Sequence, residues 1–205
     1  MTTAESESPE IFLGRARAGD VVALGQLLER YRNYLALLAR LGVGRRLQGK
    51  VDPDDAVQET FLAAHRDFPD FRGVTEGEFT AWLRQVLTRT LANLARRYAG
   101  TGKRDIRLER GLAADFDRSS RALDQGLADP GTSPSGRAAR REQAVLLADA
   151  LQALPADHRE VIVLRSLEGR PFVEVGERMG RSEDAVKKLW ARALTQLKRA
   201  LQGKP

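Results

Sequence analysis

Cationic side chains gather on a predicted helix near the end of the chain. This helix carries Lys187, Lys188 and Arg192, and it follows a short apolar helix and a turn that holds Gly180 and Arg181. A short helix, a glycine turn and a longer basic helix are typical of the helix-turn-helix, whose second helix enters the DNA major groove. We therefore expect these cations to contact phosphates and bases. The same spacing also fits a plain helical hairpin with solvated lysines.

A second polar surface is expected on a helix in the first half of the chain. At about 100° per residue, one side of this helix carries only cations and amides. They are Gln85, Arg89, Asn93 and Arg96. Such groups can contact the phosphates and base edges of a nucleic acid. The alternative is a solvated face, with Trp82 at its edge as a half-buried core residue.

The composition offers little to a catalytic mechanism. The chain has no cysteine and only two histidines, and it has no glycine-rich phosphate loop. Thiolate nucleophiles and cysteine zinc sites are excluded, and no His-x-x-x-His spacing indicates a metal. The carboxylates are scattered along helices and do not form a catalytic pair. We therefore expect no enzyme activity, no metal and no cofactor.

The net charge favours a polyanionic partner. Lys and Arg number 34 against 28 Asp and Glu, which gives a net charge of +6 and a pI near 10. The excess is concentrated, because residues 84–110 contain eight basic and two acidic side chains, and residues 181–205 contain seven and two. Two distinct nucleic-acid contacts would require such a distribution. A generically basic soluble protein stays the alternative.

Targeting signals are missing from the sequence. No apolar run approaches the ~20 residues that cross a membrane, and the first residues are acidic where a signal peptide is basic. We expect no membrane insertion and a cytoplasmic location, which also suits a chain without cysteine. The chain ends soon after the basic helix, so we expect no appended sensor domain and regulation from outside the chain.

Helix signals repeat along the chain while strand signals are scarce, so we predict an all-α protein. Two small helical domains are expected, at residues 1–110 and 142–205. Residues 111–141 between them are rich in Gly, Ala, Asp, Ser and Pro, which is typical of a flexible linker. A structureless stretch of that length is uncommon inside one compact domain. The domain boundary is therefore placed there.

Capping signals position the helices of the first domain. Asp20 is expected to cap a helix whose buried stripe begins at Val21 and whose end is marked by Gly42 and Gly44. Asp52 is expected to cap the next helix, which starts with a proline and two acids beside its positive dipole end.

A capping box opens the helix that carries the polar stripe. Thr75 and Glu78 have the required spacing. The apolar side of this helix consists of Phe79, Leu83, Val86, Leu87, Leu91, Leu94 and Tyr98.

Proline and glycine residues mark the predicted helix boundaries in the second domain. Pro155 and Gly169 bound its first predicted helix, and Pro171 begins the short helix before the turn at Gly180. Ser182 is expected to cap the final helix. The apolar stripe of that helix consists of Val186, Leu189, Ala193, Leu194, Leu197 and Leu201.

Longer segments carry a family resemblance. Residues 52–62 read Asp-Pro-Asp-Asp-Ala-Val-Gln-Glu-Thr-Phe-Leu. This segment resembles region 2.2 of bacterial RNA polymerase sigma factors of the extracytoplasmic-function (ECF) group. Residues 71–73, residues 79–83 and the basic helix through Arg97 resemble regions 2.3 and 2.4. Residues 154–155, 158–162, 167–169 and 182–201 resemble region 4, so the likeness covers nearly all of both predicted domains.

The resemblance implies a transcription initiation factor made of two helical domains. The first would dock on the clamp helices of the RNA polymerase β′ subunit, open the promoter DNA and read its minus-10 element. The second would contact the β flap and place residues 182–192 in the major groove of the minus-35 element. The resemblance also allows for an anti-sigma factor as a partner.

Matching positions assign three sets of site residues. The polymerase-facing set is Asp54, Asp55, Gln58 and Glu59. The minus-10 set is Phe71, Gln85, Arg89, Asn93, Arg96 and Arg97. The minus-35 set is Arg181, Ser182, Asp184, Lys187, Lys188 and Arg192. Within the minus-10 set, Phe71 belongs to a loop of residues 68–78 and would stack on an unstacked base.

Three positions depart from the family pattern. Arg89 stands where many members have asparagine, and His65 stands where tryptophan is common. Lys188-Leu189-Trp190 replaces a frequent Ser-Arg-Leu, and Trp190 is expected in the core. The arginine adds attraction to phosphate but removes an amide that could read a base edge. The promoter sequence and the inducing signal therefore stay open.

Two other classes of protein also fit parts of this sequence. The main alternative is a two-domain helix-turn-helix regulator that does not bind polymerase, and the acidic segment from Asp52 speaks against it. An RNA-binding or structural helical protein, whose basic surfaces only neutralise phosphate, is a second alternative.

Overall fold

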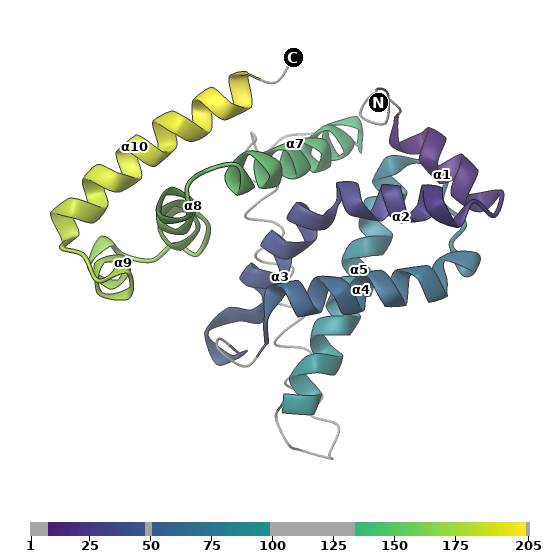
Figure 1. The fold of residues 1–205 in the computed structure, drawn as a ribbon, viewed down its shortest axis with the longest axis horizontal. Coiled ribbons are helices and arrows are strands. Elements are labelled where there is room, and N and C mark those ends of the chain that lie inside the picture. Colours follow the sequence, from purple (N-terminus) through teal and green to yellow (C-terminus); the bar gives the residue numbers. More distant parts are fainter. Residues whose placement is uncertain (1–7, 48–50, 99–133, 204–205) are drawn as a thin grey trace.

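The computed structural model describes residues 8–47, 51–98 and 134–203, and within these ranges every regular element is a helix. This confirms the all-α prediction. Two groups of helices follow one another along the chain (Figure 1). The N-terminal module contains α1 (Pro9–Arg17), α2 (Val21–Arg30), α3 (Arg32–Leu47), α4 (Pro53–Asp67) and α5 (Glu76–Tyr98). The C-terminal module contains α7 (Pro134–Gln152), α8 (Ala156–Ile162), α9 (Phe172–Met179) and α10 (Glu183–Gln202).

The helix expected from Asp20 onwards is in fact two helices. Asp20 caps α2 as predicted, because its carboxylate accepts a hydrogen bond of 3.0 Å from the backbone N–H of Ala23. The helix then breaks at Tyr31, although no glycine or proline marks the position. Tyr31 is 1% exposed and its ring meets the ring of Phe79 edge-on at 5.6 Å. Packing in the core, not a local signal, therefore places the break.

Other boundaries and one burial prediction are also corrected. Gly42 and Gly44 do not end α3, which continues to Leu47, because a glycine costs a helix only about 1 kcal/mol. Val21 is 71% exposed although it was expected in the buried stripe. It is the first residue of α2, and the buried side chains of this helix begin at Ala23.

Helix α4 begins as predicted. The Asp52 carboxylate accepts a hydrogen bond of 2.8 Å from the backbone N–H of Asp54, and Pro53 occupies the first helical position. The helix ends at Asp67 and is followed by one 3₁₀ turn, η1 (Phe68–Asp70).

Helix α5 opens with the predicted capping box. The backbone N–H of Glu78 donates to the Thr75 hydroxyl at 3.2 Å, and the backbone N–H of Thr75 donates to the Glu78 carboxylate at 3.1 Å. The helix packs against α4, and its apolar stripe is buried as expected. The buried residues are Phe79, Leu83, Val86, Leu87, Leu91 and Leu94, while the side chain of Tyr98 is outside the described residues.

The C-terminal module turns at its two predicted glycines. Helix α8 continues into one π-helical turn, η2 (Val163–Leu167), and the segment ends at Gly169 with φ +70°. Helix α9 ends at Gly180 with φ +63°, a left-handed conformation that favours glycine. Helix α10 packs along α8 and α9. Leu201, predicted in its buried stripe, is 38% exposed because it lies in the last turn of the helix.

The second module begins earlier than predicted. Helix α7 starts at Pro134, so residues 134–141, which were assigned to the linker, lie in a helix. A proline suits the first helical position, and the alanines and arginines that follow favour a helix. Residues 111–133 of the predicted linker are outside the described residues. The boundary at 141/142 therefore moves to the start of α7.

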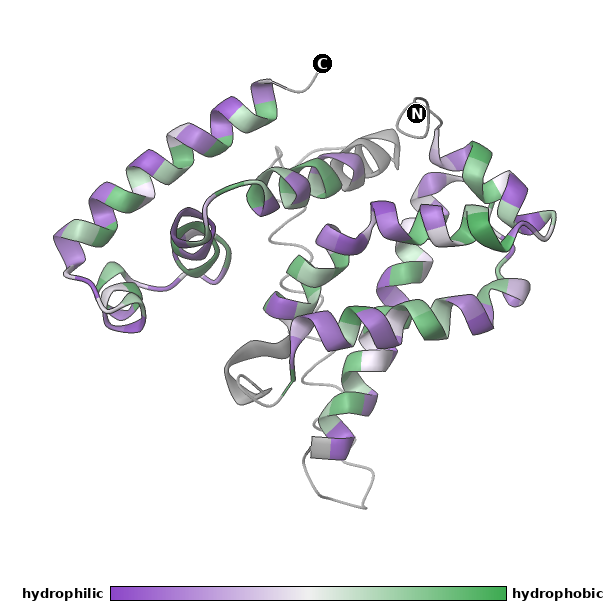
Figure 2. Ribbon diagram, in the orientation of Figure 1, coloured by the Kyte–Doolittle hydropathy of each residue, from purple (hydrophilic) through white to green (hydrophobic). Residues whose placement is uncertain are grey.

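Helix α7 joins the two modules. It packs against α3 and α5 of the first module and against α10 of the second, and it lies between the two groups of helices (Figure 1). The helices alternate hydrophobic and hydrophilic residues along their lengths (Figure 2), and the buried ones form one continuous core cluster across both modules. None of the described helices combines the length and apolarity that crossing a membrane requires.

Candidate functional site

The first turns of α4 present acids and an amide to solvent. Asp54, Asp55 and Gln58 are exposed there, beside the positive end of the helix dipole. Glu59 differs from them, because it is half-buried and its carboxylate faces α5. Three of the four predicted polymerase-facing side chains are thus accessible, and the fourth is engaged within the chain.

An ion pair joins α4 to α5. The guanidinium of Arg97 donates two hydrogen bonds to the Glu59 carboxylate, at 2.9 and 3.0 Å, in the bidentate geometry that this pair of groups favours. The two side chains are 63% and 35% exposed, so the pair contributes at most about 1 kcal/mol to stability. It unites two residues that the sequence assigned to separate surfaces.

The polar stripe of α5 faces solvent as predicted. Gln85, Arg89, Asn93 and Arg96 are all exposed, on the side opposite the buried stripe. Arg96 donates a hydrogen bond to the Asn93 amide oxygen, and Arg89 Nε donates to the carbonyl of Gln85 at 3.4 Å. These local contacts hold the guanidinium groups along the helix, where they can meet a phosphate backbone.

Residues 71–75 form a tightly bonded loop before α5. The Glu78 carboxylate accepts hydrogen bonds from the N–H of Val74 at 2.9 Å and from the Thr75 hydroxyl at 3.0 Å. The backbone N–H groups of Val74 and Thr75 lower the pKa of Glu78. A Cβ atom on Gly73 would lie only 2.3 Å from the Phe71 ring. The loop therefore has a defined shape that requires glycine.

Phe71 is not the exposed stacking surface that we expected. It is 8% exposed, because its ring packs on Trp82 at 5.0 Å and on Phe79 at 5.8 Å between centroids. Phe68 completes this cluster at 6.0 Å from Phe71. Aromatic rings bury a large apolar area when they pack in this way. Trp82 is only partly buried and is the ring of the cluster that keeps an accessible surface.

Helix α1 contacts this loop from outside. Arg17 donates a hydrogen bond of 3.3 Å to the carbonyl of Gly73, and the N–H of Glu76 donates to the Glu10 carboxylate at 3.4 Å. The helix is anchored by three buried side chains. Sequence reasoning missed α1, although Pro9 at its first turn is a start signal.

A buried tyrosine ties the first turn of α5 to the break between α2 and α3. The Tyr31 hydroxyl donates to the Glu76 carboxylate at 2.8 Å. Burial raises the pKa of Glu76, and the nearby carboxylates of Glu10 and Glu142 add to this, against the Tyr31 hydrogen bond. Burial and Glu76 together raise the pKa of Tyr31 as well. The tyrosine thus stays protonated and holds the start of α5 in place.

The turn between α9 and α10 has the close approach of a helix-turn-helix. The backbone N–H of Arg181 donates to the carbonyl of Gly176 at 2.9 Å. A Cβ atom on Gly176 would lie 2.7 Å from the carbonyl oxygen of Arg181, so no side chain fits there. Gly180 supplies the left-handed residue of the turn. The helix-turn-helix geometry was therefore correctly predicted.

Three cations line the first turns of α10. Lys187, Lys188 and Arg192 are exposed. Lys187 pairs with Glu183 one turn earlier at 2.7 Å, and this hydrogen bond raises the pKa of the lysine. The Lys187 ammonium also lies 5.9 Å from the centre of the Phe172 ring. The helix therefore presents positively charged groups, and neighbouring side chains hold Lys187 in place.

The other predicted minus-35 residues lie at the start of the same helix. Ser182 caps α10 by accepting a hydrogen bond of 3.3 Å from the N–H of Ala185. Arg181 forms an ion pair with Asp157 at the start of α8, and Asp184 is exposed. The structure thus brings all six minus-35 residues to one end of the module.

Trp190 packs inward, as expected for this position. It is half-buried, and its ring meets Phe172 edge-on at 5.6 Å. Its indole N–H donates to the Ser166 hydroxyl at 3.0 Å. This hydrogen bond links α10 to the end of η2. It helps to fix the orientation of the helix that carries the cations.

A buried arginine supports the connection between η2 and α9. Arg170 is 4% exposed, and its guanidinium pairs with Glu168 at 2.6 Å and with Glu174. Burial works against the charged form, but the two carboxylates keep the pKa of Arg170 above its usual value. The carbonyl of Arg170 accepts a hydrogen bond of 3.2 Å from Arg165. This network was not predicted from the sequence, because its partners are ordinary surface residue types.

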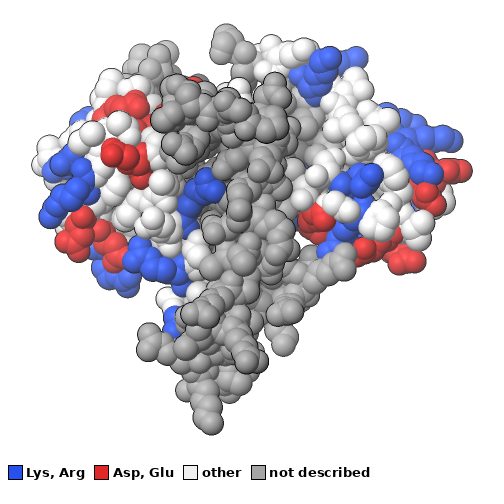
Figure 3. Space-filling model, turned by 180° about the vertical axis from the view of Figure 1, so that it is seen from behind, with Lys and Arg blue, Asp and Glu red and all other residues white. Residues whose placement is uncertain are grey.

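Cations and acids are interspersed on the surface. Figure 3 shows Lys and Arg beside Asp and Glu on the visible faces of both modules. This matches the ion pairs described above. Within the described part of the chain, no three His, Asp or Glu side chains gather as metal ligands.

Two family models match the two modules. The model described as "Sigma-70 region 2" matches residues 28–101, and "Sigma-70, region 4" matches residues 150–199. The RNA polymerase sigma factor NccH of Alcaligenes xylosoxydans xylosoxydans is 31% identical over 198 residues, covering 94% of each chain. The ECF RNA polymerase sigma-E factor of Haemophilus influenzae is 29% identical over 180 residues, covering 86% of each. The chain belongs to the ECF group of RNA polymerase sigma factors.

As an ECF sigma factor, the protein directs RNA polymerase to promoters. This confirms the function that the resemblance implied, and it does not fit a regulator that never binds polymerase. Helix α1 and most of α7 lie outside both family matches.

Solved structures with similar chains contain a second protein. One is the structure of CnrH in complex with the cytosolic domain of CnrY, with 28% identity over 97% of this chain and 100% of that one and a TM-score of 0.36. Another is the RsbN–BldN complex, with 26% identity over 91% of this chain and 96% of that one and a TM-score of 0.30.

Proposed function

We propose that each of the three surfaces described above binds a different target of this sigma factor. The first turns of α4 bind polymerase, the polar stripe of α5 binds the minus-10 element, and the first turns of α10 bind the minus-35 element. The observation that carries the proposal is the exposure of three polar surfaces on three different helices. Exposed acids lie at the start of α4, while exposed cations lie on α5 and α10. The protein then acts by binding alone.

The polymerase contact consists of Asp54, Asp55 and Gln58. An acidic helix start is complementary to a basic surface such as the proposed β′ clamp helices, and such complementarity sets orientation and association rate. Glu59, which was predicted to face polymerase, is removed from this set. Its bidentate pair with Arg97 supports a role in positioning that arginine on the minus-10 side.

The minus-10 contact combines the α5 stripe with the loop of residues 71–75. Extracting a base from the stack costs a few kcal/mol, so the receiving surface must be held in place beforehand. The capping box, the close fit at Gly73 and the contacts from α1 support such a preformed loop. Trp82 replaces Phe71 as the candidate stacking ring, because it keeps an accessible surface. An aromatic face can stack on any base.

The minus-35 contact uses the first turns of α10. A helix of 20 residues is roughly 30 Å long, so its first turns can enter a major groove while the rest packs on α8. Lys187, Lys188 and Arg192 supply attraction to phosphate. The same module would contact the β flap. Two weak DNA contacts in one chain reinforce each other through effective concentration.

A protein partner that controls the free sigma factor is also proposed. The support is the pair of complexes formed by CnrH with CnrY and by BldN with RsbN. An anti-sigma factor of this chain would have to cover one of the three surfaces to prevent initiation.

Reconstitution with core polymerase tests the proposal. Purified chain and core enzyme should together start transcription at promoters of the source genome, and a chain that never binds core would refute it. Replacing Asp54 and Asp55 by lysine should weaken core binding by about tenfold or more, because the charge on the contact is reversed. Duplex binding by the C-terminal module should stay unchanged.

Two control variants separate the proposed contact from general charge effects. Glu177→Lys reverses a charge at an exposed position of the C-terminal module, and it should leave core binding intact. Glu59→Gln should also keep core binding while it weakens binding of minus-10 DNA. Equal loss of core binding in all three variants would contradict the assignment.

A further inference from the structure

The outward face of α10 carries one carboxylate and one ammonium group in its first two turns. At about 100° per residue, Asp184 and Lys188 lie on the side of the helix opposite to the buried side chains of Val186 and Ala193. Both are exposed, and Ala191, which continues the same face, is exposed as well. The small methyl group of Ala191 leaves this face open. When the outward face enters a major groove, Asp184 and Lys188 are the polar side chains that come nearest to the bases.

The other two cations of α10 lie on the flanks of this face. Lys187 pairs with Glu183 at 2.7 Å, and its ammonium lies 5.9 Å from the centre of the Phe172 ring on α9, so it is drawn toward α9. Arg192 is exposed and lies about 140° further round the helix, on the opposite flank. Cations at the two sides of a groove-binding helix meet the phosphate backbones, which carry no sequence information. The cations of α10 are therefore not equivalent, and Lys188 is the central one.

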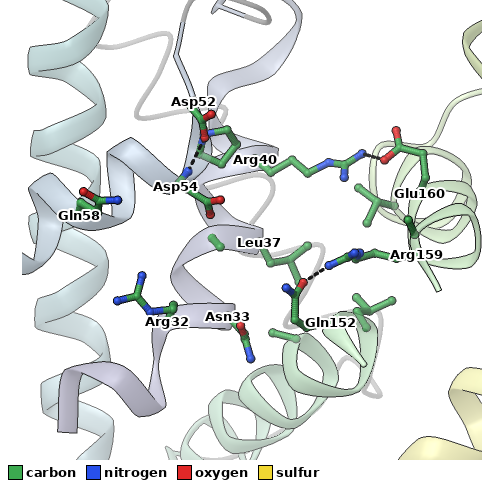
Figure 4. A pocket seen from close by; sticks show the side chains of 16 residues that line it. Arg32, Asn33, Leu37, Arg40, Asp52, Asp54, Gln58, Gln152, Arg159 and Glu160 are labelled. Atoms are coloured by element: carbon green, nitrogen blue, oxygen red, sulfur yellow. Dashed lines mark hydrogen bonds and ion pairs between the residues drawn. The ribbon is translucent and has the colours of Figure 1, made fainter. Parts of the chain in front are cut away.

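Asp184 and Lys188 also differ from other charged groups of this chain in their lack of a partner. In the groove between α3, α4 and α8, for comparison, Arg40 donates to the Glu160 carboxylate at 2.6 Å, and the Asp52 carboxylate accepts a 2.8 Å hydrogen bond from a backbone N–H (Figure 4). Among the residues that the structure describes, neither Asp184 nor Lys188 forms an ion pair. Their hydrogen-bonding groups are therefore available to a base edge.

A carboxylate and an ammonium group select opposite base edges. In the major groove, cytosine offers its N4 amine as a donor to Asp or Glu, whereas guanine offers O6 and N7 as acceptors to Lys or Arg. A carboxylate that meets guanine, thymine O4 or a phosphate finds only acceptors, and its unpaired charge lowers affinity for that sequence. The four residues from Asp184 to Lys188 rise about 6 Å along the helix, or roughly two base-pair steps. The two side chains can therefore reach neighbouring base pairs.

We infer that Asp184 and Lys188 determine the sequence specificity of the minus-35 contact: the Asp184 carboxylate accepts a hydrogen bond from the N4 amine of a cytosine, and the Lys188 ammonium donates to O6 and N7 of a guanine within about two base pairs. This inference rests on the proposed minus-35 contact. Lys188 is thereby separated from Lys187 and Arg192, which add affinity through phosphates. Asp184 acts mainly by rejection, because its charge weakens binding wherever no base amine meets it.

Selection from random-sequence duplexes provides the first test. The full-length chain, with and without core polymerase, is incubated with the pool, and the bound duplexes are sequenced. Wild type should enrich cytosine at one position and guanine within about two base pairs of it. Asp184→Asn should change that cytosine to adenine, because an amide both accepts from N6 and donates to N7 of adenine. Asp184→Ala should remove the preference at this position alone, and Lys188→Ala should remove the guanine preference.

The sign of the effect on unselected DNA provides the second test. At one fixed salt concentration, Asp184→Ala should bind a duplex without the selected sequence roughly twofold more tightly, because a charge that repels phosphate is removed. The same variant should bind the selected duplex about fivefold or more weakly. Glu177→Ala is the matched control, since it removes an exposed carboxylate from α9. It should leave the ratio of the two affinities unchanged.

The outcomes separate this inference from the proposed function. If wild type selects a sequence and both Asp184 variants select the same one, the minus-35 contact stands and the inference is overturned. Asp184 then only stabilises the start of α10 through the helix dipole. The inference also fails if Lys187→Ala loses the guanine preference and Lys188→Ala keeps it. If wild type selects no sequence in either condition, the proposed minus-35 contact fails together with the inference. Urea unfolding checks that each variant is folded.

Discussion

Regions 2 and 4 hold their basic surfaces in different ways. In region 4 the support is local, because Lys187 pairs with Glu183 on the same helix and Ser182 caps that helix. In region 2 the support spans the chain, because Arg97 pairs with Glu59 on another helix and the loop before α5 is braced by α1. The comparison shows that a basic surface can be built from one segment or assembled from several.

Each region also contains one glycine that permits a close approach. In region 4, Gly176 leaves room for a backbone carbonyl, and in region 2, Gly73 leaves room for an aromatic ring. A backbone atom in a tight turn cannot rotate away, whereas a ring can shift within its cluster. We therefore expect the two regions to respond unequally to the same substitution.

Gly176→Ala should have the largest effect. The added Cβ would lie 2.7 Å from the Arg181 carbonyl oxygen, so the turn must open at a cost of about 1–3 kcal/mol, against a gain in helix propensity of about 1 kcal/mol. Duplex binding by region 4 should be lost, and binding to core polymerase should persist. Anisotropy with labelled duplex and urea unfolding measure the two effects.

Gly25→Ala is the matched control for that variant. Gly25 lies in α2 and has no atom within 4 Å of its added Cβ, so the variant should be neutral or slightly more stable. Normal duplex binding by Gly176→Ala would show that the turn tolerates a side chain and that its geometry is not limiting.

Gly73→Ala should have an intermediate effect, confined to region 2. Its Cβ would lie 2.3 Å from the Phe71 ring, so the aromatic cluster must shift at a cost of about 1–2 kcal/mol. We expect fewer open promoter complexes, as detected by permanganate reactivity of unpaired thymines. Core binding and closed-complex binding should be kept. If the variant opens promoters as well as wild type does, the loop has no role in strand opening.

Lys187→Ala should have a smaller effect that depends on salt. If this lysine meets one phosphate, its loss should weaken duplex binding and lower the slope of log affinity against log salt by about one unit. Lys198→Ala is the control, because Lys198 is exposed on the same helix three turns further on. A slope that stays the same in both variants would assign Lys187 to solvent.

The smallest expected effect concerns Glu78 and pH. Backbone hydrogen bonds lower its folded pKa, so its contribution to stability is complete above the ordinary glutamate pKa of about 4.3 and is lost as the pH falls through the lower folded value. The stability difference between wild type and Glu78→Gln should therefore shrink below about pH 4. Urea unfolding from pH 3 to 7 measures it, with Glu177→Gln as control. A difference that stays constant with pH would contradict the role of the carboxylate.

Local signals predicted most helix starts correctly. Asp20, Asp52, Thr75 and Ser182 all cap the helices that they were expected to cap, because a cap involves only the first turn of a helix. Signals for the ends were weaker. Gly180 ends α9, but Gly42 lies inside α3, because glycine ends a helix only where the following chain turns away.

Predictions that required a distant partner were less successful. Phe71 was expected to be exposed, but three rings from other positions bury it. The break at Tyr31 depends on Phe79 and Glu76, which lie on α5. Glu59 was assigned by a family pattern, and the pattern does not contain its pairing with Arg97.

The sequence by itself determined the helical class, the caps, the helix-turn-helix and the family, because these depend on residue type and short spacing. Only the tertiary structure decided which site residues are accessible, that α1 braces the loop before α5, and that α7 joins the modules through α3. The physical reason is that burial and ion pairing depend on which surfaces meet in space. Residues far apart in the sequence supply those surfaces, and no local spacing records their contact.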